Sequence, residues 1–320
     1  VAALKRRGIT YVNGAIVVNQ DLKDSGPVLQ WEIEDVAWPY GAGLFGFNYR
    51  DNTVTVFPNT GRTKPEVSGL KICVNKTTGP NDLVRGVYSD RLMVYTRDTG
   101  NPKWSVNATV PDPSVVFVAE LTAKMKEAGI KVGTKASAPL GELMHLYTHR
   151  SPSYSEIMRS LMVRSDNLFA EGILRSIEPG STRKAAINRE KELWATRGIN
   201  TRYTIINDGS GLTRANKLSA HFIGDVLEWM ARSPMAVTYS SYFPRAGKEG
   251  TLRGFLAKSR LTGKVALKTG SVSSVQCYAG YRLDDDGKPT HIIVILVNGF
   301  FCPRSQVREA SERLLLDIFK

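Results

Sequence analysis

Hydrophobic and polar positions alternate with a period of two in the first third of the chain. Between about residues 29 and 110, short alternating stretches are punctuated by Gly, Pro, Asn and Thr, which is typical of a β-rich module. The alternation at Leu44–Tyr49 and Thr53–Phe57, with Asp51-Asn52 between them, predicts a hairpin. Lys71–Val74 and Leu92–Tyr95 predict two further short strands.

Two stretches that flank this module share one order of elements. Residues 1–14 and 120–134 both read as the end of a helix, a Gly-Ile pair and an extended segment. The first predicts a short helix that ends at Gly8, followed by a strand over Ala15–Val18. The second ends a helix that opens at Asp112-Pro113, since Pro is favoured in a first helical turn. Helix–strand units therefore bracket the β-rich module.

From Ala136 onward the apolar positions recur mainly with helical spacing. Gly263 opens a different pattern of three strands, the last two joined by the turn Asp284–Gly287. Pro303 then opens an amphipathic helix that carries Val307, Ala310, Leu314 and Ile318 on one face. The predicted helices before the sheet are Pro139–Thr148, Tyr154–Met162, Leu168–Ile177, Ser181–Thr196 and Ser219–Met230, and the predicted strands are Gly263–Leu267, Gln276–Leu283 and Thr290–Val297.

Helices followed by an antiparallel sheet predict an α+β fold for this second part. The length of 320 residues agrees with two domains. We expect a β-rich module over residues 1–135 and a second domain over residues 136–320. The longest apolar run, Ile292–Val297, is far shorter than the ~18 residues that a membrane helix needs.

The formal net charge of +13 favours an acidic partner, and the distribution of the charge along the chain bears on which kind of partner this is. Residues 1–135 contribute +4 and residues 136–320 contribute +9. The one tight basic cluster, Lys5-Arg6-Arg7, lies at a predicted helix end, where cations suit the helix dipole. The charge therefore argues against a nucleic acid and leaves three alternatives: an anionic cell envelope, a substrate that carries carboxylates, or simply a basic surface.

The three cysteines, Cys73, Cys277 and Cys302, form no C-x-x-C pair. Zinc and thioredoxin-like chemistry therefore lack their spacing. An odd count excludes a complete set of intrachain disulfides, and the disulfide status of Cys277 and Cys302 stays open.

Three short polar motifs stand in order in the second part: Ser165-Asp166-Asn167 between two predicted helices, Asp208–Leu212 in a loop, and Lys268-Thr269-Gly270 at the end of a strand. A hydroxyl can relay a proton, and an amide two residues away both donates and accepts hydrogen bonds. A Lys and a Thr at a strand edge offer an ammonium and a hydroxyl, and Gly leaves room for a backbone to approach. Together these groups suit a peptide that ends in a carboxylate.

Each motif alone has an ordinary structural explanation. Ser-Asp-Asn is also the composition of a helix cap, Asp-Gly-Ser-Gly that of a turn, and Lys-Thr-Gly that of a strand end. Their order, with helices before and a sheet after, is what favours a functional site.

Ser-x-x-Lys, Ser-Asp-Asn and Lys-Thr-Gly are the elements of penicillin-binding proteins and class A β-lactamases. The chain resembles the class C low-molecular-mass penicillin-binding proteins, the D-alanyl-D-alanine carboxypeptidase/endopeptidase family. The stretches that carry the resemblance also include Leu4–Gly14, Trp38–Asn52, Asp208–Arg214, Arg245–Arg253 and Lys268–Tyr281. Class A β-lactamases fit less well, because the chain has no Glu-x-x-Leu-Asn after Asn167.

The resemblance implies a penicillin-binding, serine β-lactamase-like fold, with the module of residues 1–135 inserted in it, and a role for each matching residue. Ser165 relays a proton to the leaving amine, and Asn167 holds the substrate amide. Lys268 supplies positive potential, Thr269 binds the carboxylate beside Gly270, and Ser271 offers an oxyanion N–H. The implied partners are a peptidoglycan peptide that ends in D-Ala-D-Ala and β-lactam antibiotics, at an extracytoplasmic site, without a cofactor or metal.

The family's nucleophile motif, Ser-x-x-Lys, belongs upstream of the inserted module. Two such strings occur here, Ser68–Lys71 in the β-rich module and Ser181–Lys184 at a predicted helix cap, and neither is in the family's position. A serine hydroxyl is weak without an adjacent base. We therefore expect the nucleophile to lie outside this chain. The chain by itself is then expected to be inactive. The alternatives are a non-catalytic peptidoglycan-binding or scaffold protein, and an esterase or class C-like β-lactamase, against which the Ser-Asp-Asn sequence argues.

The remaining candidates favour structural roles. His145 and His149 are four apart on a predicted helix, but no Glu follows His145, so the zinc-protease pattern is absent. Trp31, Trp38 and Trp104 suit the core of a small module. Arg245, Lys248 and Arg253 are interpreted as solvated charges.

Overall fold

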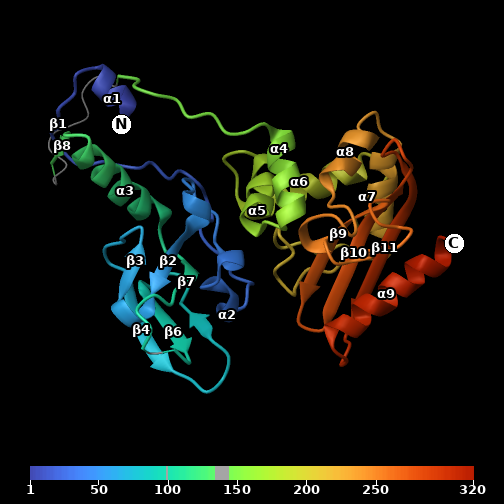
Figure 1. Cartoon of the computed structure of the whole chain (residues 1–320). Coiled ribbons are helices and arrows are strands. Elements are labelled where there is room, and N and C mark those ends of the chain that lie inside the picture. The colour runs from blue at the N-terminus through green and yellow to red at the C-terminus, as the bar shows by residue number, and fades with distance from the viewer. Residues whose placement is uncertain (99, 134–143) are drawn as a thin grey trace. The chain divides into compact units, whose positions relative to one another are not determined.

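The computed structural model describes residues 1–98, 100–133 and 144–320. These residues form two compact units, Val1–Ser151 and Pro152–Lys320 (Figure 1). The predicted domain boundary after residue 135 falls among residues 134–143, outside the described part of the chain.

A helix–strand layer holds the two ends of the first unit together. α1 (Ala2–Arg6) and α3 (Pro113–Glu127) are each followed by a two-residue strand, β1 (Tyr11–Val12) and β8 (Lys131–Val132). The two strands pair in parallel, Tyr11 with Lys131 and Val12 with Val132. The repeated order of elements in the sequence thus reflects two strands that lie side by side. The strand predicted over Ala15–Val18 is wrong, because the strand forms directly after Ile9-Thr10.

Two three-stranded sheets make up the rest of the first unit. Apolar side chains of both sheets and Val116 of α3 form one buried core. The strand orders are β3-β2-β7 and β4-β6-β5. The bounds are β2 (Thr53–Phe57), β3 (Arg62–Lys64), β4 (Lys71–Lys76), β5 (Asp82–Val84), β6 (Arg91–Thr96) and β7 (Val106–Thr109), with the short helices α2 (Ile33–Val36), η1 (Pro39–Gly41), η2 (Arg50–Asn52) and η3 (Pro58–Thr60).

The predicted hairpin of Leu44–Tyr49 with Thr53–Phe57 is wrong. Asn52 is fully buried, and its side chain donates to Gly43 O and accepts from Tyr49 N at 2.9 and 3.0 Å. These bonds fold the preceding loop back on itself, with positive φ at Arg50, Asp51 and Asn52. β2 pairs instead with β3 and β7, so side-chain bonds of one Asn outweigh the alternating pattern.

The second unit begins with helices whose first residues the sequence marks clearly. Ser153, Asp166, Thr182 and Ser219 each accept a hydrogen bond from a backbone N–H of the first turn. The cap of the third of these helices is thus Thr182 rather than Ser181. The helices are α4 (Tyr154–Arg164), α5 (Asn167–Ser176), α6 (Arg183–Ala195), α7 (Ala220–Ala231), α8 (Ala236–Tyr242) and the short η4 (Gly250–Leu252).

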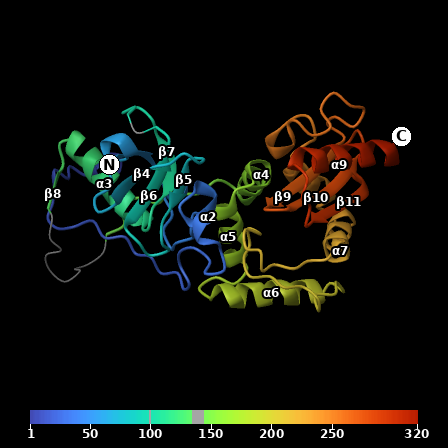
Figure 2. The ribbon, with the colours of Figure 1, turned by 90° about the horizontal axis from the view of Figure 1, so that it is seen from below.

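An antiparallel sheet of order β11-β10-β9 follows. β9 (Val265–Val272), β10 (Val275–Leu283) and β11 (Pro289–Asn298) form it, and α9 (Arg304–Ile318) lies across one face while α7 lies on the other (Figure 2). Tyr278 and Leu315 belong to the core between the sheet and α9. Tyr281 and Leu227 belong to the core on the side of the helices. The predicted α+β class is confirmed for this unit.

Two further sequence predictions need correction, and one helix is missing from the predicted elements. The helix predicted over Pro139–Thr148 lies partly outside the described residues, and residues 144–148 have no regular structure. α8 was not predicted. The face of α9 is displaced, since Val307, Ser311 and Leu315 are buried while Leu314 is 48% exposed.

Candidate active site

The Ser165-Asp166-Asn167 motif forms a tight corner between two helices. Ser165 ends α4 in a left-handed conformation, with φ 57° and ψ 54°. Asp166 caps α5 by accepting a hydrogen bond from Phe169 N at 3.1 Å, and it also pairs with Arg164 at 2.9 Å. Asn167 is the first residue of α5 and is partly buried. The corner therefore fixes Ser165 and Asn167 two residues apart at the junction of α4 and α5.

The structure brings Ser165 together with Lys268, 103 residues later. Lys268 Nζ donates to Ser165 Oγ at 2.6 Å and to Thr269 O at 2.6 Å. Lys268 lies in β9 opposite Ala279 of β10, so the sheet determines where the ammonium enters the corner. Two of the three ordered motifs thus share a hydrogen bond.

Burial lowers the pKa of Lys268 to about 8. The ammonium still predominates at neutral pH. A cation within hydrogen-bond distance of a hydroxyl raises the electrostatic potential at that oxygen, which favours an anion or a developing negative charge nearby.

The Lys-Thr-Gly motif does not end the strand as the sequence suggested. β9 continues to Val272, and Gly270 and Ser271 are exposed within it. Thr269 Oγ1 donates to Thr251 Oγ1 at 2.9 Å. The exposed end of β9 therefore presents a hydroxyl, a glycine and backbone groups beside the Lys268 ammonium.

Two buried carboxylates hold the loop Asp208–Arg214: Glu171 joins it to α5, and Asp208 fixes its internal fold. Glu171 Oε1 accepts from Gly209 N and Ser210 N, both at 2.9 Å. Asp208 accepts from the backbone N–H groups of Gly211 and Thr213 at 2.9 and 2.8 Å. A side chain at Gly209 would meet Ala170 O at 2.7 Å, so only glycine allows this approach.

Glu171 is not among the site residues predicted from the sequence. It is fully buried, and burial, with Asp208 nearby, raises its pKa. Arg183 Nε lies 3.6 Å from its second oxygen. A signal was present in the sequence, because Glu171 occupies the apolar stripe of α5 between Leu168 and Leu174.

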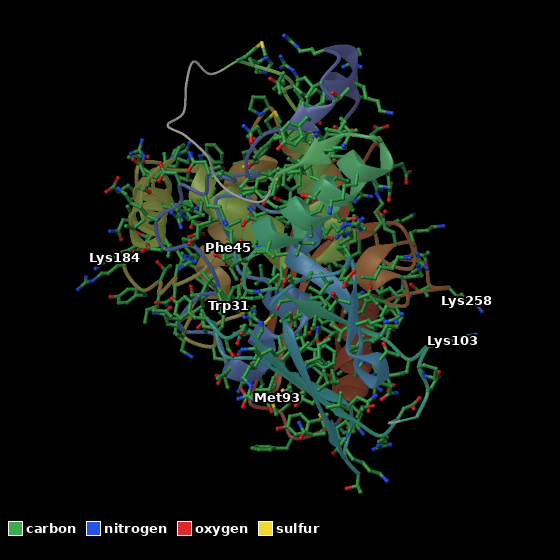
Figure 3. All side chains as sticks on the ribbon, turned by 90° about the vertical axis from the view of Figure 1, so that its left-hand side faces the viewer. Trp31, Phe45, Met93, Lys103, Lys184 and Lys258 are labelled. Atoms are coloured by element: carbon green, nitrogen blue, oxygen red, sulfur yellow. The ribbon has the colours of Figure 1, made fainter. Side chains whose placement is uncertain are left out.

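The two Ser-x-x-Lys strings have other surroundings. Ser68 lies in a turn, and Lys71, the first residue of β4, pairs with Asp90 at 3.0 Å. Ser181 Oγ lies 2.6 Å from Glu178 O and 3.1 Å from Thr182 O. Lys184 is exposed and extends away from the ribbon (Figure 3).

Several other candidates have structural surroundings. Trp31 is buried, and Trp38 and Trp104 pack against the core of the first unit. Arg245 donates to Gly263 O at 3.1 Å, whereas Lys248 and Arg253 are exposed. All three cysteines are free thiols.

The histidine pair does not lie on a helix as predicted. Residues 144–150 are irregular, and His145 Nε2 lies 2.7 Å from Thr148 Oγ1. Among residues 1–98, 100–133 and 144–320, no group of three or more His, Cys, Asp or Glu side chains is placed to hold a metal ion. None of the helices in the described part of the chain is long and apolar enough to cross a membrane.

Comparison with known proteins gives a match along the chain. The family of D-Ala-D-Ala carboxypeptidase 3 (S13) matches residues 1–315. A D-alanyl-D-alanine carboxypeptidase of Actinomadura sp. (strain R39) is 32% identical over 158 residues, which cover 47% of this chain and 29% of that protein. D-alanyl-D-alanine carboxypeptidase DacB of Haemophilus influenzae is 28% identical over 197 residues, covering 58% of this chain and 40% of that protein. The matches thus span less than half the length of these relatives.

Solved structures show the same fold. Penicillin binding protein 4 (dacB) from Haemophilus influenzae superposes with a TM-score of 0.80 at 22% identity, over 100% of this chain and 78% of that chain. The same protein complexed with a β-lactam gives a TM-score of 0.73 at 21% identity, over 100% and 76% of the two chains. The likeness to these structures confirms the predicted penicillin-binding fold.

Proposed function

The chain belongs to the D-Ala-D-Ala carboxypeptidase 3 (S13) family, and on this basis we propose that it provides most of a serine-type D-alanyl-D-alanine carboxypeptidase/endopeptidase. Its substrate is a peptidoglycan stem peptide that ends in D-Ala-D-Ala, and penicillin acylates the same serine. The hydrogen bond between Lys268 Nζ and Ser165 Oγ is the observation that carries the proposal. It joins a proton-relay hydroxyl to a cation at the edge of an exposed strand. We further assign residues 1–135 to the inserted module and residues 136–320 to the catalytic domain.

The reaction proceeds through an acyl-enzyme. The nucleophilic serine attacks the carbonyl carbon of the penultimate D-alanine, so a C–O ester bond forms and the C–N peptide bond breaks. Ser165 relays the proton from the nucleophile to the amine of the departing D-alanine. Water then hydrolyses the ester, and its proton restores the serine. General acid–base transfer of this kind contributes roughly 10²–10⁴-fold in rate.

The other residues of the site bind and orient the peptide. Thr269 donates to the terminal carboxylate, and the Lys268 ammonium attracts it. Asn167 holds the peptide amide. Gly270 lets the substrate backbone approach β9, and the N–H of Ser271 stabilises the oxyanion, a contribution of roughly 10²–10³-fold in rate. The exposed position of Gly270 and Ser271 in β9 supports these assignments.

The nucleophile comes from a Ser-x-x-Lys segment outside residues 1–320. The surroundings of Ser68 and Ser181 support this, since the Ser181 hydroxyl contacts backbone carbonyl oxygens and Lys71 pairs with Asp90. A hydroxyl so engaged has no base to activate it. Residues 1–320 alone are therefore expected to be inactive, and the whole protein acts in the cell envelope, on the extracytoplasmic side.

A labelled penicillin tests the proposal directly. The full-length protein is expected to take up about one label per molecule, and residues 1–320 alone none. A full-length protein that carries an upstream Ser-x-x-Lys and takes up no label would overturn the enzymatic claim. If it then still binds muropeptides without turnover, the alternative of a non-catalytic peptidoglycan-binding protein replaces it. Labelling of residues 1–320 alone would show that the nucleophile assignment is wrong.

A further inference from the structure

A short turn between α8 and β9 contacts the hydroxyl that the proposed mechanism uses for carboxylate binding. It comprises Glu249–Leu252 and contains η4. Thr251 is exposed, and its Oγ1 lies 2.9 Å from Thr269 Oγ1. The turn lies within the stretch Arg245–Arg253, in which the sequence predicts no role for Thr251.

An ion pair fixes the first residue of the turn to α4, the helix that ends at Ser165. Arg159 Nη2 donates to Glu249 Oε2 at 2.6 Å. Arg159 Nη1 also donates to the carbonyl oxygens of Tyr242 and Phe243, both at 3.2 Å. The other carboxylate oxygen of Glu249 accepts from Arg245 N at 3.2 Å. The Glu249 carboxylate is thus held by α4 and by the chain that leads into the turn.

Close packing fixes the middle and the end of the turn. Gly250 has φ 54°, and a side chain there would meet Val163 O at 2.4 Å, so glycine is required for this approach to α4. Leu252 is fully buried in the same core cluster as Leu267, the residue before Lys268. Thr251 is therefore held between the end of α4 and β9, the two elements that carry Ser165 and Thr269.

The two hydroxyl groups have one hydrogen each, and this limits what they can bind. With Thr269 donating to Thr251, the hydrogen of Thr269 is used. Rotation of the two hydroxyl hydrogens alone reverses the bond, because a hydroxyl both donates and accepts. Thr251 then donates to Thr269, and the hydrogen of Thr269 is available to an anion. A hydroxyl that accepts a hydrogen bond is also a stronger donor.

We propose that Thr251 is a positioning residue of the carboxylate-binding site. Its hydroxyl donates to Thr269 Oγ1 when a carboxylate is bound and so directs the Thr269 hydrogen toward that carboxylate. The inference rests on the proposed function for the role of Thr269. It adds that preference for a free carboxylate depends on a residue outside the Lys-Thr-Gly motif.

Acylation of the full-length protein by a penicillin and by its neutral methyl ester tests this. Thr251→Val keeps the shape and removes the hydroxyl, so acylation by the free acid is expected to slow about three- to tenfold, the value of one hydrogen bond. Acylation by the ester is expected to change less than twofold. Thr251→Ser restores the hydroxyl and is expected to stay within about twofold of the wild type for both compounds, on the same hydrogen-bond scale.

Thr196→Val is the matched control. Thr196 caps the end of α6, and its hydroxyl donates to Leu193 O at 2.9 Å, so its loss should alter neither rate. Equal rates for Thr251→Val and wild type with the free acid would overturn the inference. An equal slowing with acid and ester would also overturn it, since that result indicates a structural role only.

A binding measurement separates this inference from the proposed function. Calorimetric affinities for a peptide that ends in D-Ala-D-Ala and for its C-terminal amide need no nucleophile. If the wild type is not acylated but prefers the acid, and Thr251→Val loses that preference, the proposed function fails and the inference stands. If the wild type shows no preference for the acid, the inference fails. If the wild type is acylated and Thr251→Val leaves the preference for the acid unchanged, the inference fails while the proposed function stands.

Discussion

Ser165 has a left-handed backbone, φ 57° and ψ 54°, which few residues other than Gly, Asn and Asp adopt. The capping bond of Asp166 to Phe169 N and the pairing of Asp166 with Arg164 hold the corner in this form. A conformation of this kind costs of order 1–3 kcal/mol and persists only where its surroundings determine it. Here it lets α4 end and α5 begin within three residues, with the Ser165 hydroxyl at Lys268.

Replacement of Ser165 tests whether its hydroxyl is the relay. Ser165→Ala in the full-length protein is expected to slow acylation by penicillin roughly 10²–10⁴-fold, the contribution of a positioned proton-transfer group. Stopped-flow or quenched labelling measures this rate. Ser176→Ala is the control, because the Ser176 hydroxyl donates to Ile173 O in the last turn of α5, away from Lys268. A loss below about fivefold would contradict a relay role on that same scale.

The pKa of Lys268, about 8, predicts how activity depends on pH. Above that pH the ammonium loses its proton, so acylation by the penicillin anion should fall about tenfold per pH unit, as for one essential ionisation.

The stability of the folded protein should rise over the pH range in which the acylation rate falls. The folded protein releases this proton near pH 8, whereas the unfolded chain holds it to about 10.5, so the free energy of unfolding rises between these values.

Lys268→Met isolates the contribution of this one group. The free energy of unfolding of wild type and of Lys268→Met is measured by denaturant unfolding from pH 7 to 10.5. The rise with pH that Lys268 causes should be present in wild type and absent from the variant. Parallel pH profiles for the two proteins would contradict the assignment. An acylation rate that stays level to pH 10 would contradict it independently.

At the residue scale, the types and the order of the motif residues favour one site for Ser165 and Lys268, and the resemblance to penicillin-binding proteins implies their roles. In the structure Lys268 Nζ lies 2.6 Å from Ser165 Oγ. Glu171 and Thr251 were missed for a physical reason. Each acts through a contact with a distant segment, Gly209-Ser210 and Thr269 respectively. Such contacts depend on tertiary packing. Glu171 leaves a local sign, a charged residue in the apolar stripe of α5, whereas Thr251 leaves none.

At the scale of elements, the helical spacing of apolar positions predicted most helices of the second unit, and their N-terminal capping bonds are local in sequence. Ser153, Asp166 and Ser219 each bond a residue three positions later. The ends and pairing partners of the strands were harder to predict from the sequence. The hairpin prediction failed at Asn52, whose side-chain bonds compete with strand pairing. The predicted strand ends too early, because Lys268 and Gly270 have low strand propensity, whereas β9 pairs with β10 as far as Val272.

The corrected face of α9 gives a prediction at the scale of an element. Leu315 is 2% exposed in the core beneath the sheet, whereas Leu314 is 48% exposed. Leu315→Ala is therefore expected to lower the free energy of unfolding by about 2–5 kcal/mol. Leu314→Ala is expected to lower it by less than about 1 kcal/mol, as for an exposed site. Urea denaturation of both variants measures the difference, and equal losses would contradict the observed helix face.

At the scale of the whole molecule, the resemblance in the sequence already implied the fold that the solved structures share with this chain. The sequence also predicted a β-rich module with bracketing helices, and the parallel pairing of β1 with β8 explains the repeated helix–strand order. The sites of chain reversal inside that module were not predictable. They depend on buried polar side chains such as Asn52 and on Arg85, which donates to Thr109 Oγ1 at 2.9 Å.

The basic charge of the molecule predicts electrostatic steering of anionic substrates. The net charge is +13, and +9 of it belongs to residues 136–320. The second-order acylation rate with penicillin should fall about two- to fivefold between about 0.01 and 0.3 M salt, because screening shortens the range of attraction. The neutral methyl ester should show almost no salt dependence. Lys184 and Lys258 are exposed and extend from the ribbon of the second unit (Figure 3).

Reversing those two charges separates steering from local binding. Lys184→Glu with Lys258→Glu lowers the net charge by four, so the salt dependence for penicillin should flatten while the rate at high salt stays unchanged. Thr251→Val should have the opposite effect. It should lower the acylation rate at every salt concentration and leave the salt dependence of that rate unchanged, because a hydrogen bond at contact distance is little affected by screening. If the charge reversal lowered the rate equally at low and high salt, the two lysines would act in the site itself. The contribution of these two charges would then be local to the carboxylate-binding site.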